Sequence, residues 1–153
     1  MGAKTVDVVR SGCILPANHA TENALLVYCP DLADWPRSWM GEERDVVPGE
    51  ALVACFKPFL FYLLSLNLSK KTLRRHRDNL WILGGEVIRD LQMTPKLRKR
   101  PIEALVFSVI GDDGGPLMYH GDSEEEQRSF DSTCRKLYRF LNDPKNNPPT
   151  IPR

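Results

Sequence analysis

The residues with the clearest chemical potential lie between Ser69 and Leu91, in the segment SKKTLRRHRDNLWILGGEVIRDL. A serine suited to capping a helix is followed by six cationic or imidazole side chains, and the segment then becomes apolar. The side-chain oxygen of an N-cap serine accepts a hydrogen bond from the free N–H groups of the first helical turn. This pattern predicts a basic helix start joined to a buried helix body. Its chemistry is electrostatic, because such cations bind and position phosphate groups.

The spacing of these cations places them on neighbouring stripes of one helix. At 3.6 residues per turn, one stripe contains Lys70, Arg74, Arg77 and Trp81. A second stripe, about 100° away, contains Lys71 and Arg75. Cations at a helix N-terminus oppose the helix dipole, so an anionic partner would compensate them. The alternative is a solvated charged face paired with acids of the Glu42–Asp45 run.

Two further groups of cations follow. The second basic cluster, in a short connection, consists of Lys96, Arg98, Lys99 and Arg100. It either lines one groove together with the first helix or forms a solubilising turn. The outer face of the last helix carries Arg128, Arg135 and Arg139. Helix-dipole compensation explains most of that third stripe.

No catalytic or metal-binding pattern is recognisable. The histidines are His19, His76 and His120, and none has the spacing of a zinc or iron site. His76 falls on the apolar stripe of its helix, which is typical of a hydrogen-bonded core residue. We therefore expect no metal, no cofactor and no enzymatic activity, although a Cys–His pair formed only in space leaves no recognisable spacing in a sequence.

The cysteines and apolar stretches bear on location. Cys13, Cys29, Cys55 and Cys134 include no C-x-x-C pair, and Cys55 and Cys134 fall on apolar helix faces. No signal peptide is recognisable, and the apolar run at 59–64 is too short to span a bilayer. These features predict a cytoplasmic protein with reduced thiols that does not bind membranes.

Length and charge set the outer bounds. The chain has 153 residues, 42% of them hydrophobic and 27% charged, which suits one globular domain. The net charge is only +1, but Ser69 to Arg100 holds ten cations and three acids, a local balance of +7. Acidic segments at 22–50 and 112–131 almost cancel it. Any attraction to an anionic partner is therefore local.

Helical periodicity dominates the remaining sequence. We expect an arm or edge strand at 1–20, a short helix at 21–28, and an ordered loop whose Trp35 and Trp39 plug the core. A buried helix should run from Pro48 to Leu66, with Pro58 causing a kink or dividing it into two helices. The Ser69 helix contains Gly84 and Gly85, which indicate either close packing of another helix or a bend.

The C-terminal third continues the helical pattern. Pro101 should begin a further helix, and Ser123 should cap a last helix that ends near Leu141. The predicted fold is an all-α bundle of four to five helices at 21–143. A disordered tail is expected at 144–153, because that stretch is rich in Pro and Asn.

The stretch FKPFLFYLLSLNLSKKTLRRHRDNLWIL resembles the SAM-like core-binding domain of tyrosine recombinases and phage integrases. The shared pattern is an apolar helix at 56–66, a Leu68–Ser69 break and a basic helix at 72–83. The resemblance covers about 51–91. In that family this domain clamps DNA opposite the catalytic domain. The resemblance implies phosphate-backbone contacts by Lys70, Lys71, Thr72, Arg74, Arg75 and Arg77.

The catalytic signatures of that family are missing here. The residue three positions after His76 is Asn79, so the H-x-x-R motif is absent, and Tyr138 has no matching context. Recombinase activity is therefore not implied. The segments PDLADWPRSW and SFDSTCRKLYRFL also resemble an uncharacterised bacterial or mobile-element family.

Two functions follow from these patterns. The first is a non-enzymatic domain that binds nucleic acid, in particular duplex DNA, through the Ser69 helix and the Lys96–Arg100 turn. The alternative is a protein-interaction or inhibitor module of a phage, plasmid or bacterial system, which would use acids at 42–45 and 122–126 and the Trp loop. Its candidate residues are Trp35, Trp39, Glu42, Glu43 and Asp45. The oligomeric state stays open, and a head-to-tail dimer is compatible with the charges.

Overall fold

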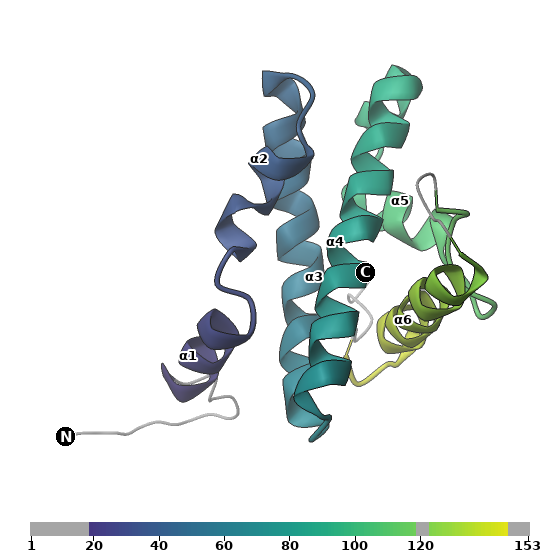
Figure 1. Cartoon of the computed structure of the whole chain (residues 1–153). Coiled ribbons are helices and arrows are strands. Elements are labelled where there is room, and N and C mark those ends of the chain that lie inside the picture. The colour runs from purple at the N-terminus through teal and green to yellow at the C-terminus, as the bar shows by residue number, and fades with distance from the viewer. Residues whose placement is uncertain (1–18, 119–122, 147–153) are drawn as a thin grey trace.

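The computed structural model describes residues 19–118 and 123–146 of the chain (Figure 1). This described part of the chain is an all-α bundle and contains no β-strand, as the sequence predicts. The α-helices are α1 (His19–Tyr28), α2 (Trp35–Trp39), α3 (Val46–Ser65), α4 (Lys70–Met93), α5 (Ile102–Val109) and α6 (Glu124–Asn142). The 3-10 turns are η2 (Leu32–Asp34), η3 (Glu43–Asp45) and η4 (Pro95–Lys99). The expected arm at 1–20 lies outside the described residues, except that α1 already begins at His19. Most of the expected tail, 147–153, also lies outside them.

The long helices α3 and α4 form the centre of the bundle. Helices α1 and α2 lie along one side of this pair and α5 and α6 along the other (Figure 1). The prediction of two shorter helices meeting at Pro58 is wrong, because α3 is one helix from Val46 to Ser65. Pro58 leaves the carbonyl of Ala54 without its helical donor. Both residues lie on the exposed side, where water can satisfy that carbonyl.

The core comes from the apolar stripes that the sequence predicts. Fully buried side chains include Leu52, Phe56, Phe59, Leu60 and Leu63 of α3, Leu80 and Leu83 of α4, and Phe130, Cys134 and Leu137 of α6. The link between α3 and α4 turns at Asn67, whose φ of 62° is in the left-handed region that asparagine tolerates.

The tryptophan segment is more ordered than a loop, since it folds as η2, α2 and η3. Trp35 and Trp39 are buried, which confirms that they plug the core. The Trp39 ring lies directly on Gly84, so closely that a Cβ at that position would collide with it. The Trp39 Nε1–H also donates to the carbonyl of Trp81 at 2.9 Å. The helix that packs against the glycines is therefore the short α2.

One helical stretch bears on the expectation about membrane spans. Glu43–Ser65, 23 residues with a hydropathy of 1.5, is long and apolar enough to cross a bilayer by length and composition. A core helix of a soluble bundle passes the same test. The inward face of α3 is packed against α4, α5 and the N-terminal helices, as in such a core helix.

Candidate nucleic-acid interface

The N-terminus of α4 is a well-formed helix start. The Ser69 Oγ accepts the backbone N–H of Thr72 at 3.1 Å and donates to the Thr72 Oγ1 at 3.0 Å. The predicted cap is therefore present, and the Thr72 hydroxyl belongs to it. Because the cap orders the first turn, the cations that follow project from a rigid element.

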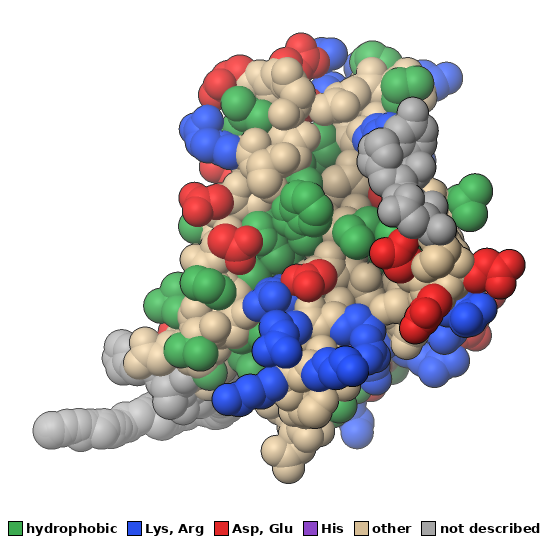
Figure 2. Space-filling model, in the orientation of Figure 1, with side chains coloured by type: hydrophobic (Ala, Val, Ile, Leu, Met, Phe, Trp, Pro, Cys, Tyr) green, Lys and Arg blue, Asp and Glu red, His purple; other side chains and the backbone are tan. Residues whose placement is uncertain are grey.

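Four cations of this helix start lie at the surface: Lys70, Lys71, Arg74 and Arg75. Within the described residues none of them forms a hydrogen bond or ion pair. Figure 2 shows Lys and Arg side chains gathered over this end of the molecule. The structure thus leaves these four charges uncompensated from within.

Arg77 has a different environment from the other cations of its stripe. It donates from NH1 to the carbonyl of Tyr28 at 3.0 Å and from Nε to the Asp78 Oδ1 at 3.0 Å. The Tyr28 hydroxyl in turn donates to the carbonyl of Leu73 at 2.6 Å. Arg77 therefore fastens the end of α1 to α4, and its charge is already partnered.

Helix α6 brings two more cations to the same end of α4. Arg135 and Lys136 are partly exposed and form no ion pair within the described part of the chain. The charges of Lys136 and Arg75 both lower the pKa of the buried His76, and His76 contacts Thr133, one turn before Lys136 on α6. We call Lys70, Lys71, Arg74, Arg75, Arg135 and Lys136 the basic face. The sequence offered no signal for Lys136, because only the packing of α6 on α4 brings it there.

A polar cleft of about 400 Å³ adjoins the α6 side of the basic face. Arg135, Lys136 and Arg139 line it together with Tyr62 of α3. The Arg139 Nε lies 3.4 Å from the Asp112 Oδ1, so its charge is partly compensated. The cleft could hold a phosphate group of a longer ligand, because among its described lining residues three are cations and only one, Asp143, is an acid.

His76 is a core residue, as predicted. Its Nδ1 lies 2.7 Å from the Thr133 Oγ1, and the Asn79 amide donates to the same oxygen at 2.9 Å. Burial, together with the charges of Lys136 and Arg75, lowers the pKa of His76 to about 4. The imidazole is therefore neutral at pH 7 and joins α4 to α6 beneath the basic face.

Acidification should weaken the fold through His76. Its pKa falls from an ordinary 6.5 to about 4 on folding. Between these values the unfolded chain binds a proton that the folded chain excludes, so stability is complete above pH 6.5 and falls as the pH is lowered toward 4. We expect a loss of about 2–3 kcal/mol between pH 7 and 4.5, measured by urea unfolding. The His76→Gln variant should lose correspondingly less unfolding free energy between pH 7 and 4.5. An equal loss in the variant and the wild type would contradict the role of His76 in this pH dependence.

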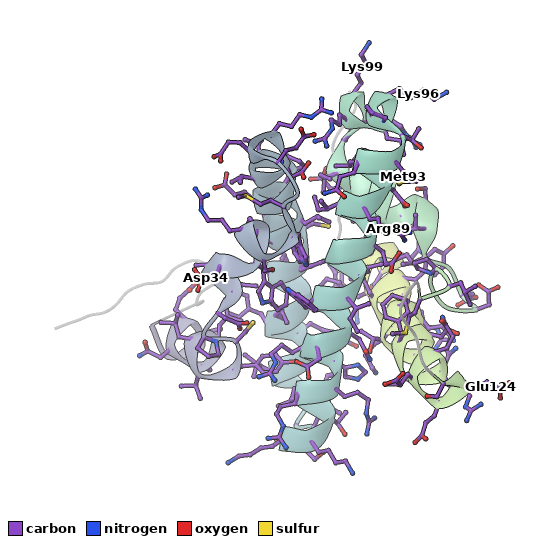
Figure 3. The ribbon with its side chains drawn as sticks, turned by 45° about the horizontal axis from the view of Figure 1, so that its top comes forward. Asp34, Arg89, Met93, Lys96, Lys99 and Glu124 are labelled. Atoms are coloured by element: carbon purple, nitrogen blue, oxygen red, sulfur yellow. The ribbon has the colours of Figure 1, made fainter. Side chains whose placement is uncertain are left out.

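The second basic cluster does not join the first. Lys70 is the first residue of the 24-residue α4, which is about 36 Å long, and Lys96 lies past its other end. Lys96 and Lys99 project at that far end (Figure 3). Arg98 is mostly buried, and its NH2 lies 2.6 Å from the Asp45 Oδ1. The predicted shared groove is therefore not formed, and Arg98 is a structural residue.

The alternative partner surface is also largely internal. Trp35, Trp39 and Asp45 are buried, so they offer no contact to a partner. The Glu42 carboxylate pairs with Arg44 at 2.6 Å and lies 3.6 Å from Arg98. Of the five residues predicted for that surface, only Glu42 and Glu43 remain exposed. The turn formers and acids of this segment build an internal contact.

In the described residues, no group of three or more His, Cys, Asp and Glu side chains is placed to hold a metal ion. Cys29, Cys55 and Cys134 are free thiols, and burial raises their pKa values.

The fold and the basic face together define an all-α bundle with a two-helix cationic surface. Comparison with protein families, curated proteins and solved structures found no match to the chain.

Proposed function

We propose that this protein is a non-enzymatic, cytoplasmic nucleic-acid-binding domain that contacts the phosphate backbone of duplex DNA through its basic face. The observation that carries the proposal is the set of six cations from α4 and α6 that form no ion pair within the described part of the chain. Their mutual repulsion is relieved when phosphates bind. The free N–H groups at the start of α4 point to the same end and also favour an anion.

The mechanism is phosphate neutralisation with release of counterions. If each cation of the basic face meets one phosphate, the slope of log affinity against log salt is about −5. No Asn or Gln pair stands on this face to read base edges, so sequence preference should be weak. The six residues of the basic face include no aromatic ring, and Tyr62, which lines the adjoining cleft, is only partly exposed, which favours a duplex over a single strand.

The likeness to the core-binding domain of tyrosine recombinases supports the same proposal. The α3–α4 hairpin has the apolar helix, the short break and the basic helix of that pattern. Within it, the structure favours Lys70, Lys71, Arg74 and Arg75 as phosphate ligands and gives Arg77 a structural role. The protein would thus clamp DNA without cutting it, as part of a mobile element or a bacterial system.

Charge reversal at the start of α4 should abolish DNA binding. Arg74→Glu with Arg75→Glu reverses two charges of the basic face and lowers the net charge by four, and both side chains are exposed. We expect at least a hundredfold weaker binding of a labelled 25-base-pair duplex, measured by fluorescence anisotropy between 50 and 200 mM salt. The thermal unfolding midpoint should stay close to that of the wild type.

The matched control is Lys96→Glu with Lys99→Glu, which makes the same change in net charge at the far end of α4. It should retain most of the affinity. Equal loss in both double variants would mean that net charge, and not the basic face, drives binding. Absence of binding by the wild type even at 50 mM salt would refute nucleic acid as the partner.

A further inference from the structure

A second surface of α4 lies beyond the basic face and is built differently. Trp81 is 41% exposed there, although most large apolar side chains of the bundle are buried. It stands between two clefts of about 480 and 460 Å³, and both clefts are lined by Trp81 and Ile82. We call this surface the Trp81 groove. Figure 2 shows hydrophobic side chains in the middle of this view, above the Lys and Arg side chains.

The groove is held in a fixed shape by hydrogen bonds behind it. The Trp81 Nε1–H donates to the Ser38 Oγ at 2.8 Å, and the Ser38 hydroxyl donates to the carbonyl of Trp35 at 2.7 Å. Gly85, one turn after Trp81, lines the upper cleft and keeps it open because it has no side chain. A surface whose anchor ring is already positioned loses little entropy on binding.

The walls of the groove come from different elements and are acidic. The lower cleft, of about 480 Å³, is bordered by Asp31 and Asp78. The upper cleft, of about 460 Å³, is bordered by Glu86 and Glu126. Acidic side chains stand on both sides of the hydrophobic ones in Figure 2.

Two arginines also line the clefts, but each is paired with a neighbouring acid. The Arg77 Nε lies 3.0 Å from the Asp78 Oδ1, and the Arg89 NH1 lies 3.8 Å from the Glu86 Oε1. Among the described residues, each cleft is therefore lined by two carboxylates and one arginine, a balance of −1. The groove combines an apolar floor with a net negative border.

We propose that the Trp81 groove binds an amphipathic helix of a partner protein, with an apolar stripe on Trp81 and Ile82 and with Lys or Arg on its flanks. From Arg77 to Arg89 the groove follows α4 for about 18 Å, which matches three turns of a bound helix. Helix-in-groove recognition uses apolar anchors of this kind, and tryptophan is prominent among residues that dominate binding energy.

Charge complementarity selects this occupant over two others. Duplex DNA would bring phosphates against the acidic border, which repels them. A second copy of this chain could offer the cations of its basic face, but that face has no exposed apolar stripe to fill the two clefts. A basic amphipathic helix supplies both features. The inference is independent of the proposed DNA binding, because it rests on other residues of α4.

The test uses a defined peptide. A fluorescein-labelled 18-residue helix of Leu and Lys, with Leu at i, i+3, i+4 and i+7, is titrated with the protein at 150 mM salt. A second peptide replaces every Lys with Glu and keeps the Leu stripe. We expect micromolar binding of the Lys peptide, measured by anisotropy, and at least tenfold weaker binding of the Glu peptide. Absence of binding by both peptides, or equal binding, overturns the proposal.

Variants locate the binding site. Trp81→Ala should weaken binding of the Lys peptide at least tenfold. Trp81→Phe should bind it with an affinity within a few-fold of that of the wild type. Phe107→Ala is the matched control, because Phe107 is an aromatic residue of α5 with the same 41% exposure and lines neither cleft. Wild-type affinity of the Trp81→Ala variant would place binding elsewhere and overturn the proposal.

A second variant guards against unfolding of the first. Gly85→Lys fills the upper cleft and adds a cation, so it should weaken binding of the Lys peptide. Because it also replaces a glycine within a helix, it should not destabilise α4. Sedimentation of the protein alone distinguishes the remaining occupant. A dimer that disappears in Trp81→Ala would show that a second copy fills the groove and would refute the partner helix.

Discussion

Replacing Asp45 with Asn is expected to lower the free energy of unfolding by about 3–5 kcal/mol, the loss typical of breaking a buried ion pair. Asp45 has 0% exposure. One carboxylate oxygen accepts from the amides of Gly41 and Glu42 and from the Gln92 side chain, at 2.8 to 3.1 Å. The other accepts from Arg98 at 2.6 Å. An amide at this position would present an N–H to donors and leave the Arg98 charge buried.

The protonation of Asp45 shows how strongly the site favours its charge. Burial alone would raise the pKa of this carboxyl, but the hydrogen bonds from Arg98, Gln92 and the two backbone amides outweigh burial and hold the pKa well below its usual range. Because the folded pKa is depressed, the stabilisation is complete above about pH 4 and is lost only as the pH falls below that value. The effect of Asp45→Asn should therefore be fully visible at pH 7.

Urea unfolding at pH 7, followed by tryptophan fluorescence, measures the loss. Glu43→Gln is the control, since Glu43 is an exposed acid of the same 3-10 turn and should change stability by less than about 0.5 kcal/mol. If Asp45→Asn cost less than about 1 kcal/mol, the carboxylate would not hold η3, α4 and η4 together as the geometry indicates.

The second large effect is expected where Trp39 meets Gly84. Trp39→Ala should cost about 3–5 kcal/mol, since it removes a buried indole from the contact between α2 and α4. Gly84→Ala should be destabilising by about 1–3 kcal/mol, because the added methyl collides with the Trp39 ring. Alanine is otherwise preferred to glycine in a helix by about 1 kcal/mol, so the collision reverses the ordinary sign.

The neighbouring glycine supplies a matched control. A Cβ at Gly85 would lie 3.4 Å from the Trp39 Cδ1, which is an ordinary contact, so Gly85→Ala should be neutral or stabilising. In a Trp39→Ala background, Gly84→Ala should become stabilising as well. Thermal and urea unfolding of the wild type, the two single variants and the double variant form a double-mutant cycle. Destabilisation by Gly84→Ala in both backgrounds would show that the ring is not the cause.

Local signals in the sequence were sufficient for the elements of the fold. Ser69 and Ser123 cap α4 and α6 as predicted, because N-capping depends on residues only three positions apart. The apolar periodicity predicted the buried faces of α3, α4 and α6, since one face of a helix is determined by spacing alone. The assignment of His76 to the core followed from the same stripe and is confirmed.

Only the tertiary structure decided which charges remain available to a ligand. Arg98 pairs with Asp45 across 53 positions of sequence, and Arg77 binds the Tyr28 carbonyl across 49 positions. In contrast, Lys136 and Arg75 both come close enough to His76 to lower its pKa, because α6 packs on α4. By itself the sequence determined an all-α bundle with a basic helix start. The partners of its ionic groups depended on long-range packing, because charge pairing requires proximity in space. The spacing of residues along one helix does not determine which residues of other helices lie near them.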